Sequence, residues 1–340
     1  MYASAAKLIH TVFSMETRDL RAILTPDLLI SIYNTALPAP GTTVERLFEI
    51  YFGDGFGGDT IAKLHALALH KVFVPLSHIL PASYPSNLLS PLPNPASKDF
   101  PKQALGLLLL LDQVTRLILK RHNVRWTAGF FDPLALRLAQ QLDELPPALH
   151  LTNVQRWMGI DAKLSWSDAM LRCSLFTLPF THSEKPAVQA RAQDLAEQQR
   201  EAVESYHGRR DPSRDDGRAR VDDAVALPRL VQGVVPPVYF AGGGFGDFFF
   251  FDCQITRAHA SPLEEFGRYP WRNAMLGRID TGKEAEFLLS IGNFARMEDE
   301  IRRDIRGDVV RSVWRPLETP CSEATVVESR LDRDVGFDGR

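Results

Sequence analysis

Apolar residues recur with helical spacing along most of the chain. In residues 60–80 apolar side chains return every three or four positions, as on one face of a helix. Similar patterns predict helices over residues 103–122, 132–142 and 184–206, and two more between residues 150 and 182. Few segments alternate with the period of two that is typical of strands. The pattern therefore predicts an all-α fold.

Local signals mark several of the expected helix ends. Asp132 is expected as an N-cap, with Pro133 at the first helical position. Ser183 is expected to cap the next long helix, with Glu184 in its first turn. Residues 261–264 and 281–284 have the spacing of capping boxes. The first is expected to restart or kink a helix that begins at about residue 247, and the second to open a helix through residue 289.

The same pattern suggests how the chain is organised. Residues 1–44 are expected to form an N-terminal helical extension, and residues 45–317 a single helical domain. Residues 207–246 look like an insertion, because they are highly charged up to residue 223 and then apolar but broken by Pro and Gly. Residues 318–340 are expected to form a loose C-terminal tail.

Charge and cysteine content narrow the partners that are expected. The net charge of -3 gives no reason to expect nucleic acid or an anionic membrane as a partner. No apolar run approaches the roughly 20 residues of a membrane helix. Three widely spaced cysteines suggest a reducing compartment, and we expect a cytoplasmic protein. No His, Cys or carboxylate spacing fits a metal site, so neither a metal nor a cofactor is expected.

Residues 53–58 match the G-x-G-x-x-G pattern of dinucleotide-binding proteins. They follow residues 47–52, which could form a strand, and precede a predicted helix. However, Ser77 and His78 stand where the acidic residue of such a site is expected, and no alternating β-α pattern follows. We therefore interpret residues 53–58 as a Gly-rich loop between two helices.

Three polar groups stand in apolar surroundings, where unpaired polar atoms are costly. Asp112 and Arg116 are four residues apart on one predicted helix and can pair, with Gln113 beside them. His182 with a carboxylate beside it, Glu184, could act as a general base. The last group surrounds a helix that is predicted to end at Gly267, and it consists of His259, Arg268, Trp271, Arg272 and Asn273.

Two hypotheses account for these groups. In the first, an enzyme or binder for a small anionic or partly apolar metabolite moves protons with His and carboxylate groups. Its candidate catalytic residues are Asp112, His182, Glu184 and His259, and its substrate-binding candidates are Gln113, Arg116, Arg268, Trp271, Arg272 and Asn273. In the second, the chain is a helical-repeat module for protein interaction. Its charges would be structural, with an Asp112–Arg116 pair and with arginines that cap helix carbonyls or pair with Glu264 and Glu265. A protein partner therefore stays open.

A set of short motifs gives a more specific indication. In chain order they are Leu111-Asp112-Gln113, Asp132-Pro133-Leu134-Ala135-Leu136, Pro179-Phe180-Thr181-His182-Ser183-Glu184 with Gln189, His259, Phe266-Gly267-Arg268-Tyr269-Pro270-Trp271-Arg272-Asn273 and Leu276-Gly277-Arg278. In order and spacing this set resembles the family known as domain of unknown function 924, over residues 45–290. The resemblance implies a compact array of antiparallel helices similar to tetratricopeptide-repeat proteins. It implies no established activity.

The chain departs from this family pattern at two places. Thr115-Arg116-Leu117 stands where the family has Pro-Arg-Asn, and Trp271 stands where it has His. If that His is catalytic in other members, this chain has changed or lost the chemistry.

Overall fold

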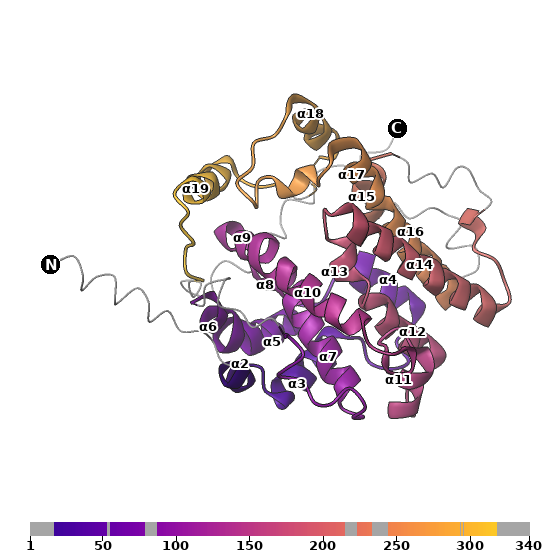
Figure 1. The fold of residues 1–340 in the computed structure, drawn as a ribbon. Coiled ribbons are helices and arrows are strands. Elements are labelled where there is room, and N and C mark those ends of the chain that lie inside the picture. Colours follow the sequence, from indigo (N-terminus) through magenta and orange to yellow (C-terminus); the bar gives the residue numbers. More distant parts are fainter. Residues whose placement is uncertain are drawn as a thin grey trace.

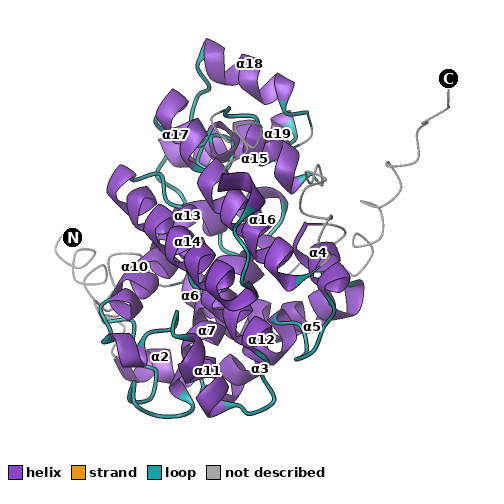
Figure 2. Ribbon diagram, turned by 90° about the vertical axis from the view of Figure 1, so that its right-hand side faces the viewer, coloured by secondary structure: helices purple, strands orange, loops and turns teal. Residues whose placement is uncertain are grey.

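Every regular element in the part of the chain that the structure describes is a helix (Figure 1, Figure 2). The computed structural model describes residues 17–52, 55–78, 87–214, 223–232, 244–292, 294 and 296–317. The expectation of an all-α fold is confirmed. The α-helices are α2 (Thr17–Ile23), α3 (Pro26–Ala36), α4 (Val44–Phe52), α5 (Gly58–Ala68), α6 (Val74–Ser77), α7 (Phe100–Leu109), α8 (Thr115–Ile118), α9 (Val124–Trp126), α10 (Asp132–Asp143), α11 (Val154–Ile160), α12 (Trp166–Leu175), α13 (Leu178–Thr181), α14 (Pro186–His207), α15 (Ala226–Val231), α16 (Phe245–Ala258), α17 (Ala260–Phe266), α18 (Gly282–Ser290) and α19 (Asp299–Val310).

Shorter helical turns join several of these helices. The π-helical segments are η1 (Leu69–Phe73), η3 (Leu110–Val114) and η5 (Thr127–Phe131). The 3₁₀ turns are η4 (Arg121–Asn123), η6 (Pro147–Leu149), η7 (Pro212–Arg214) and η9 (Pro270–Arg272). Two of the π-helical segments, η3 and η5, carry or adjoin polar residues of the candidate site. Such wide turns inside longer helices often occur at functional sites.

The N-terminal half is built around the close contact between α3 and α7. Leu29 and Ile32 of α3 are fully buried there, in the same core as the apolar side chains of α7. Gly106 lets the two helices approach closely, because a Cβ at this position would lie only 2.2 Å from the carbonyl oxygen of Leu29. The expected domain boundary at residue 44 stays a prediction, but α3 belongs to the main core.

The other major contact joins α14 and α16, the long helices seen side by side in Figure 2. Phe248, Phe249, Phe250 and Phe251 of α16 are all buried. Phe251 packs edge-on against Phe52 of α4, with 4.8 Å between the ring centroids. This aromatic layer links residues that precede and follow the long polar helix α14, and it makes one continuous core.

Some local expectations about helix ends are confirmed. Thr281 and Glu284 form a reciprocal capping box at the start of α18. Gly267 ends α17 in the left-handed conformation, with φ of +70°. Residues 47–52 belong to a helix, and the Gly-rich segment connects α4 to α5 as expected, although residues 53 and 54 lie outside the described part.

Three other expectations about helix starts are wrong. Asp132 does not cap α10, because η5 is already helical before it and the carboxylate binds arginines instead. Ser183 accepts from the N–H of Lys185, and α14 begins only at Pro186, so Glu184 is outside its first turn. Residues 261–264 make no capping box, because α17 begins at Ala260 almost directly after α16.

Much of the expected insertion and the whole expected C-terminal tail, residues 318–340, lie outside the described residues. The described ends of the insertion are held by α14 and α16. Gln254 of α16 donates to the buried Ser213 in η7, and Arg214 pairs with Glu204 of α14. The boundaries of these segments, like the likeness to tetratricopeptide-repeat proteins, stay predictions. Among the described residues, no helix has the length and apolar character needed to cross a membrane.

Candidate functional site

A buried carboxylate orients His182. The Nδ1 atom of His182 lies 2.8 Å from Oδ1 of Asp112, which is on the π-helical segment η3. The Asp112 side chain is 2% exposed, whereas the His182 ring, just after α13, is 19% exposed. The sequence suggested that Glu184 orients this ring, but Asp112 does so instead. The Nε2 atom of His182 has no hydrogen-bond partner among the described residues.

Asp112 stays ionised in this setting. Burial alone would raise its pKa, but Arg116, His182 and the amide of Gln113 together hold the pKa well below its usual range. An ionised carboxylate can only accept hydrogen bonds, so Nδ1 of His182 carries the shared proton. The lone pair of the neutral ring is then on Nε2, which is the arrangement of a general base with its orienting carboxylate.

Asp132 joins two arginines from distant parts of the chain. Its Oδ1 lies 2.8 Å from Nη1 of Arg116, and its Oδ2 lies 2.7 Å from Nη2 of Arg272. Arg116 also reaches the backbone carbonyl and the carboxylate of Asp112, so the expected pair between these two residues is confirmed. The result is a continuous chain of charges from Arg272 through Asp132 and Arg116 to Asp112 and His182.

Arg272 ties the other end of this chain to the backbone. Its Nη1 donates to the carbonyl of His182 at 2.6 Å, and its Nη2 donates to the carbonyl of Ala128 at 3.0 Å. Ala128 belongs to η5, the π-helical segment directly before Asp132. These contacts hold the end of α13, and therefore the backbone of His182, against the start of α10.

His259 stands next to His182. The ring centroids of the two histidines are 6.1 Å apart, and His259 lies where α16 gives way to α17. Nδ1 of His259 donates to the carbonyl of Ile255 at 2.7 Å, which leaves the lone pair on Nε2. Burial, and then the charge that His182 carries when it is protonated, lower the pKa of His259 to about 3. The ring of His259 is therefore neutral at physiological pH.

Tyr269 and Gln189 support the segment that carries His182. The Tyr269 hydroxyl donates to the carbonyl of Thr181 at 2.7 Å and accepts from the amide of Gln189 at 2.8 Å. The same amide reaches the carbonyls of Thr181 and Ser183. The carbonyls at the end of α13, on both sides of His182, are thus held by buried side chains.

Glu184 has a partner of its own. Arg278 forms a two-pronged ion pair with its carboxylate, at 3.0 and 2.7 Å, and the backbone N–H of Tyr269 donates to it as well. Burial would raise the pKa of Glu184, but Arg278 and Arg272 lower it overall. Glu184 therefore anchors the segment around residues 269–278 to the loop after α13, and its expected catalytic role stays a prediction.

The remaining substrate-binding candidates are engaged with other residues of the chain. Arg268 forms a two-pronged pair with Glu284, at 2.6 and 2.8 Å, rather than with Glu264 or Glu265. Asn273 is fully buried and donates to Asp280 at 2.9 Å. Trp271 stacks on Tyr269, with 4.9 Å between ring centroids. Their role in ligand binding stays a prediction.

The family model for bacterial proteins of unknown function (DUF924) matches residues 90–292, well over half of the chain. The chain belongs to this family. Comparison with curated proteins and with solved structures finds no match. The matched DUF924 region contains every residue of the charge chain and both histidines. It begins after α3, α4 and α5, so these helices lie outside the match.

Asp132 is the site residue that the sequence did not reveal. Asp132 stands before a proline at an expected helix start, and an N-cap there explains an acidic residue without any further role. That interpretation left no reason to expect that Arg116 and Arg272 share this carboxylate. The signal that could have found it is the charge balance of the DUF924 motifs, in which four arginines otherwise meet only two carboxylates, Asp112 and Glu184; the arginines are Arg116, Arg268, Arg272 and Arg278. Among the described residues, no group of three or more His, Cys, Asp or Glu could hold a metal ion.

Proposed function

We propose that this DUF924 protein is an enzyme in which His182 transfers a proton to or from a small anionic substrate. The observation that carries the proposal is the Asp112–His182 pair, in which Nδ1 is occupied at 2.8 Å and Nε2 is free among the described residues. The ring is partly exposed, so a substrate can reach it, and its carboxylate partner is buried behind it.

Arg116 is the most suitable anchor for the substrate. Only its Nη1 contacts described residues, so the Nε and Nη2 groups retain unused donors, and the side chain is 30% exposed. Arg116 also pairs with Asp112, the carboxylate that holds His182, so its guanidinium lies next to the pair that carries the proposal. A guanidinium with free donors suits a carboxylate or phosphate group.

In the proposed reaction, Nε2 of His182 takes a proton from a substrate hydroxyl or from a water molecule. The imidazolium that forms is stabilised by the ionised Asp112, to which its Nδ1–H still donates. The neutral His259 lies close enough to orient the same substrate group but does not compete for the proton, because its pKa is about 3. Arg272 and Asp132 position the pair without contacting the substrate.

The proposal is tested by incubating the purified protein with a small-molecule extract and following the composition by mass spectrometry. We expect one class of anionic metabolite to be consumed, and His182→Gln to slow this by about a hundredfold or more. Asp112→Asn should also slow turnover, because an amide no longer holds the ring in the same proton arrangement.

His70→Gln is the matched control, since His70 is an exposed histidine of η1. It should turn over the metabolite at the rate of the unmodified protein. Circular dichroism of each variant checks that the fold is kept. An extract that the protein leaves unchanged, or a folded His182→Gln variant with full activity, would refute the enzymatic role.

A further inference from the structure

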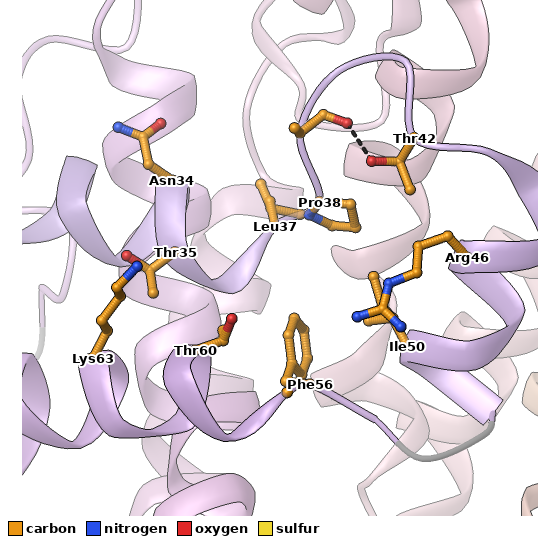
Figure 3. A pocket seen from close by; sticks show the side chains of 12 residues that line it. Asn34, Thr35, Leu37, Pro38, Thr42, Arg46, Ile50, Phe56, Thr60 and Lys63 are labelled. Atoms are coloured by element: carbon orange, nitrogen blue, oxygen red, sulfur yellow. Dashed lines mark hydrogen bonds between the residues drawn. The ribbon is translucent and has the colours of Figure 1, made fainter.

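A polar cavity lies away from the histidines, between α3, α4 and the start of α5 (Figure 3). Its volume is about 360 Å³, which is enough for a metabolite-sized ligand. The apolar part of the wall is formed by Leu37, Pro38, Ile50 and Phe56. Because the family match starts at residue 90, none of these residues belongs to the matched region.

Two cations stand at opposite sides of this cavity. Figure 3 shows Lys63 beside Thr35 and Thr60 on one side of Phe56, with Arg46 on the other side. Lys63 has no ion-pair or hydrogen-bond partner among the described residues. Arg46 is paired with Glu49, but both side chains are at least half exposed, so the pair contributes little and leaves the guanidinium available.

None of the described residues that line this cavity is acidic, and Glu49, the exposed partner of Arg46, is not part of the lining. The start of α5 leaves further space, because a Cβ at Gly57 or Gly58 would meet no atom within 4 Å. Neither glycine has a positive φ, so backbone conformation does not require glycine there. Phe56 and Gly57, which belong to the Gly-rich segment, therefore border an open, positively charged cavity.

We propose that this cavity binds a linear organic dianion, such as an α,ω-dicarboxylate. One anionic group pairs with Lys63 and the hydroxyl groups near it, and the other pairs with Arg46. The apolar middle of the ligand packs over Phe56. Because the two cations lie on opposite sides of Phe56, a ligand with one charge at each end suits the cavity better than a single compact anion (Figure 3).

The test is calorimetric titration of the full chain with dicarboxylates of increasing length: succinate, glutarate, adipate and pimelate. Butyrate and inorganic phosphate are the comparison probes. We expect one chain length to bind best, and butyrate to bind at least about tenfold more weakly because it engages one cation only. Lys63→Met and Arg46→Met should each weaken dicarboxylate binding by about tenfold or more.

Lys71→Met is the matched control, since Lys71 is an exposed lysine that does not line the cavity. His182→Gln should also leave binding unchanged, which separates this site from the proposed active site. Equal binding of butyrate or phosphate, loss of binding in Lys71→Met as large as in Lys63→Met, or no binding by any dicarboxylate at millimolar concentration would each overturn the proposal.

Discussion

The charge chain around Asp132 and the cavity beside Phe56 differ in whether their cationic side chains have buried partners. In the charge chain, Arg116 and Arg272 are tied to carboxylates whose side chains are 2% and 9% exposed. In the cavity, Lys63 has no partner in the described part of the chain, and Arg46 has only an exposed one. A buried charge needs an opposite charge within the protein, whereas an exposed charge is solvated by water and stays available to bind a ligand.

This comparison separates structure from function among residues of the same type. Arg272 looks like a ligand anchor in the sequence, but its contacts are with His182, Ala128 and Asp132 of the same chain. Within the charge chain, Nε2 of His182 and the Nε and Nη2 groups of Arg116 have no hydrogen-bond partner among the described residues. These unpaired atoms, rather than the charges themselves, are the basis of the proposed substrate site.

The largest effect is expected when the shared carboxylate of the charge chain is removed. Asp132→Ala leaves Arg116 and Arg272 without their common partner, and it should lower the free energy of unfolding by about 3–5 kcal/mol. Urea denaturation followed by circular dichroism measures the change. Asp161→Ala, which removes a more exposed pair with Lys102, should cost less than about 1 kcal/mol. Similar losses for both variants would mean that Asp132 does not hold the charge chain together.

The next largest effect is expected at the apolar contact between α3 and α7, which is also buried. Gly106→Ala places a Cβ 2.2 Å from the carbonyl oxygen of Leu29, so α3 and α7 must separate. We expect a loss of about 1–3 kcal/mol in unfolding free energy, measured in the same way. Gly159→Ala in α11 is the control, since its Cβ meets nothing within 4 Å, and it should be neutral or stabilising. Equal behaviour of the two variants would show that the α3–α7 contact tolerates expansion.

The neutral ring of His259 makes the charge-chain region sensitive to acid. Its pKa is about 3 in the folded protein because of burial and the charge of His182, and ordinary in the unfolded chain. The folded state thus binds this proton less readily, so stability is complete above the unfolded pKa and is lost as the pH falls toward 3. At about pH 5 the loss should be roughly 2 kcal/mol.

Urea denaturation at neutral pH and at about pH 5 tests this prediction. His259→Gln cannot take up the proton in either state, so its stability should fall less between the two pH values than that of the unmodified protein. The neighbouring carboxylates change protonation at lower pH, since the pKa values of Asp112 and Glu184 are lowered. A pH dependence that persists unchanged in His259→Gln would assign it to other groups.

The sequence predicted the helical class because apolar spacing depends on local geometry. It predicted the capping box at Thr281–Glu284 for the same reason, since each of the two side chains bonds to the backbone N–H of the other residue. The capping box expected at residues 261–264 does not form, because α17 begins at Ala260 almost directly after α16, and His259 rather than Ser261 precedes it. Local signals were reliable where the chain was free to follow them, and were overridden where packing already made the backbone helical.

The sequence named most of the candidate site but not its connections. Asp112, Arg116, His182 and His259 stand out in the sequence as polar residues in apolar surroundings, and the structure brings them together. Spacing predicts the Asp112–Arg116 pair, but it cannot reveal a contact across 70 residues such as that between Asp112 and His182. Hence Glu184 was assigned to His182 as its nearest carboxylate in sequence, although Arg278 is its partner.

The smallest effects on stability are expected at the cavity, where the charges are exposed. Glu49→Ala removes the partner of Arg46 and should change the unfolding free energy by less than about 1 kcal/mol. The same change frees the guanidinium and removes a nearby negative charge, so dicarboxylate binding should become tighter, as calorimetry can show. If Glu49→Ala instead weakens binding, the carboxylate holds Arg46 in its binding position, and the exposed pair is part of the site. If it destabilises the fold as much as Asp132→Ala does, the contrast between the two regions is wrong.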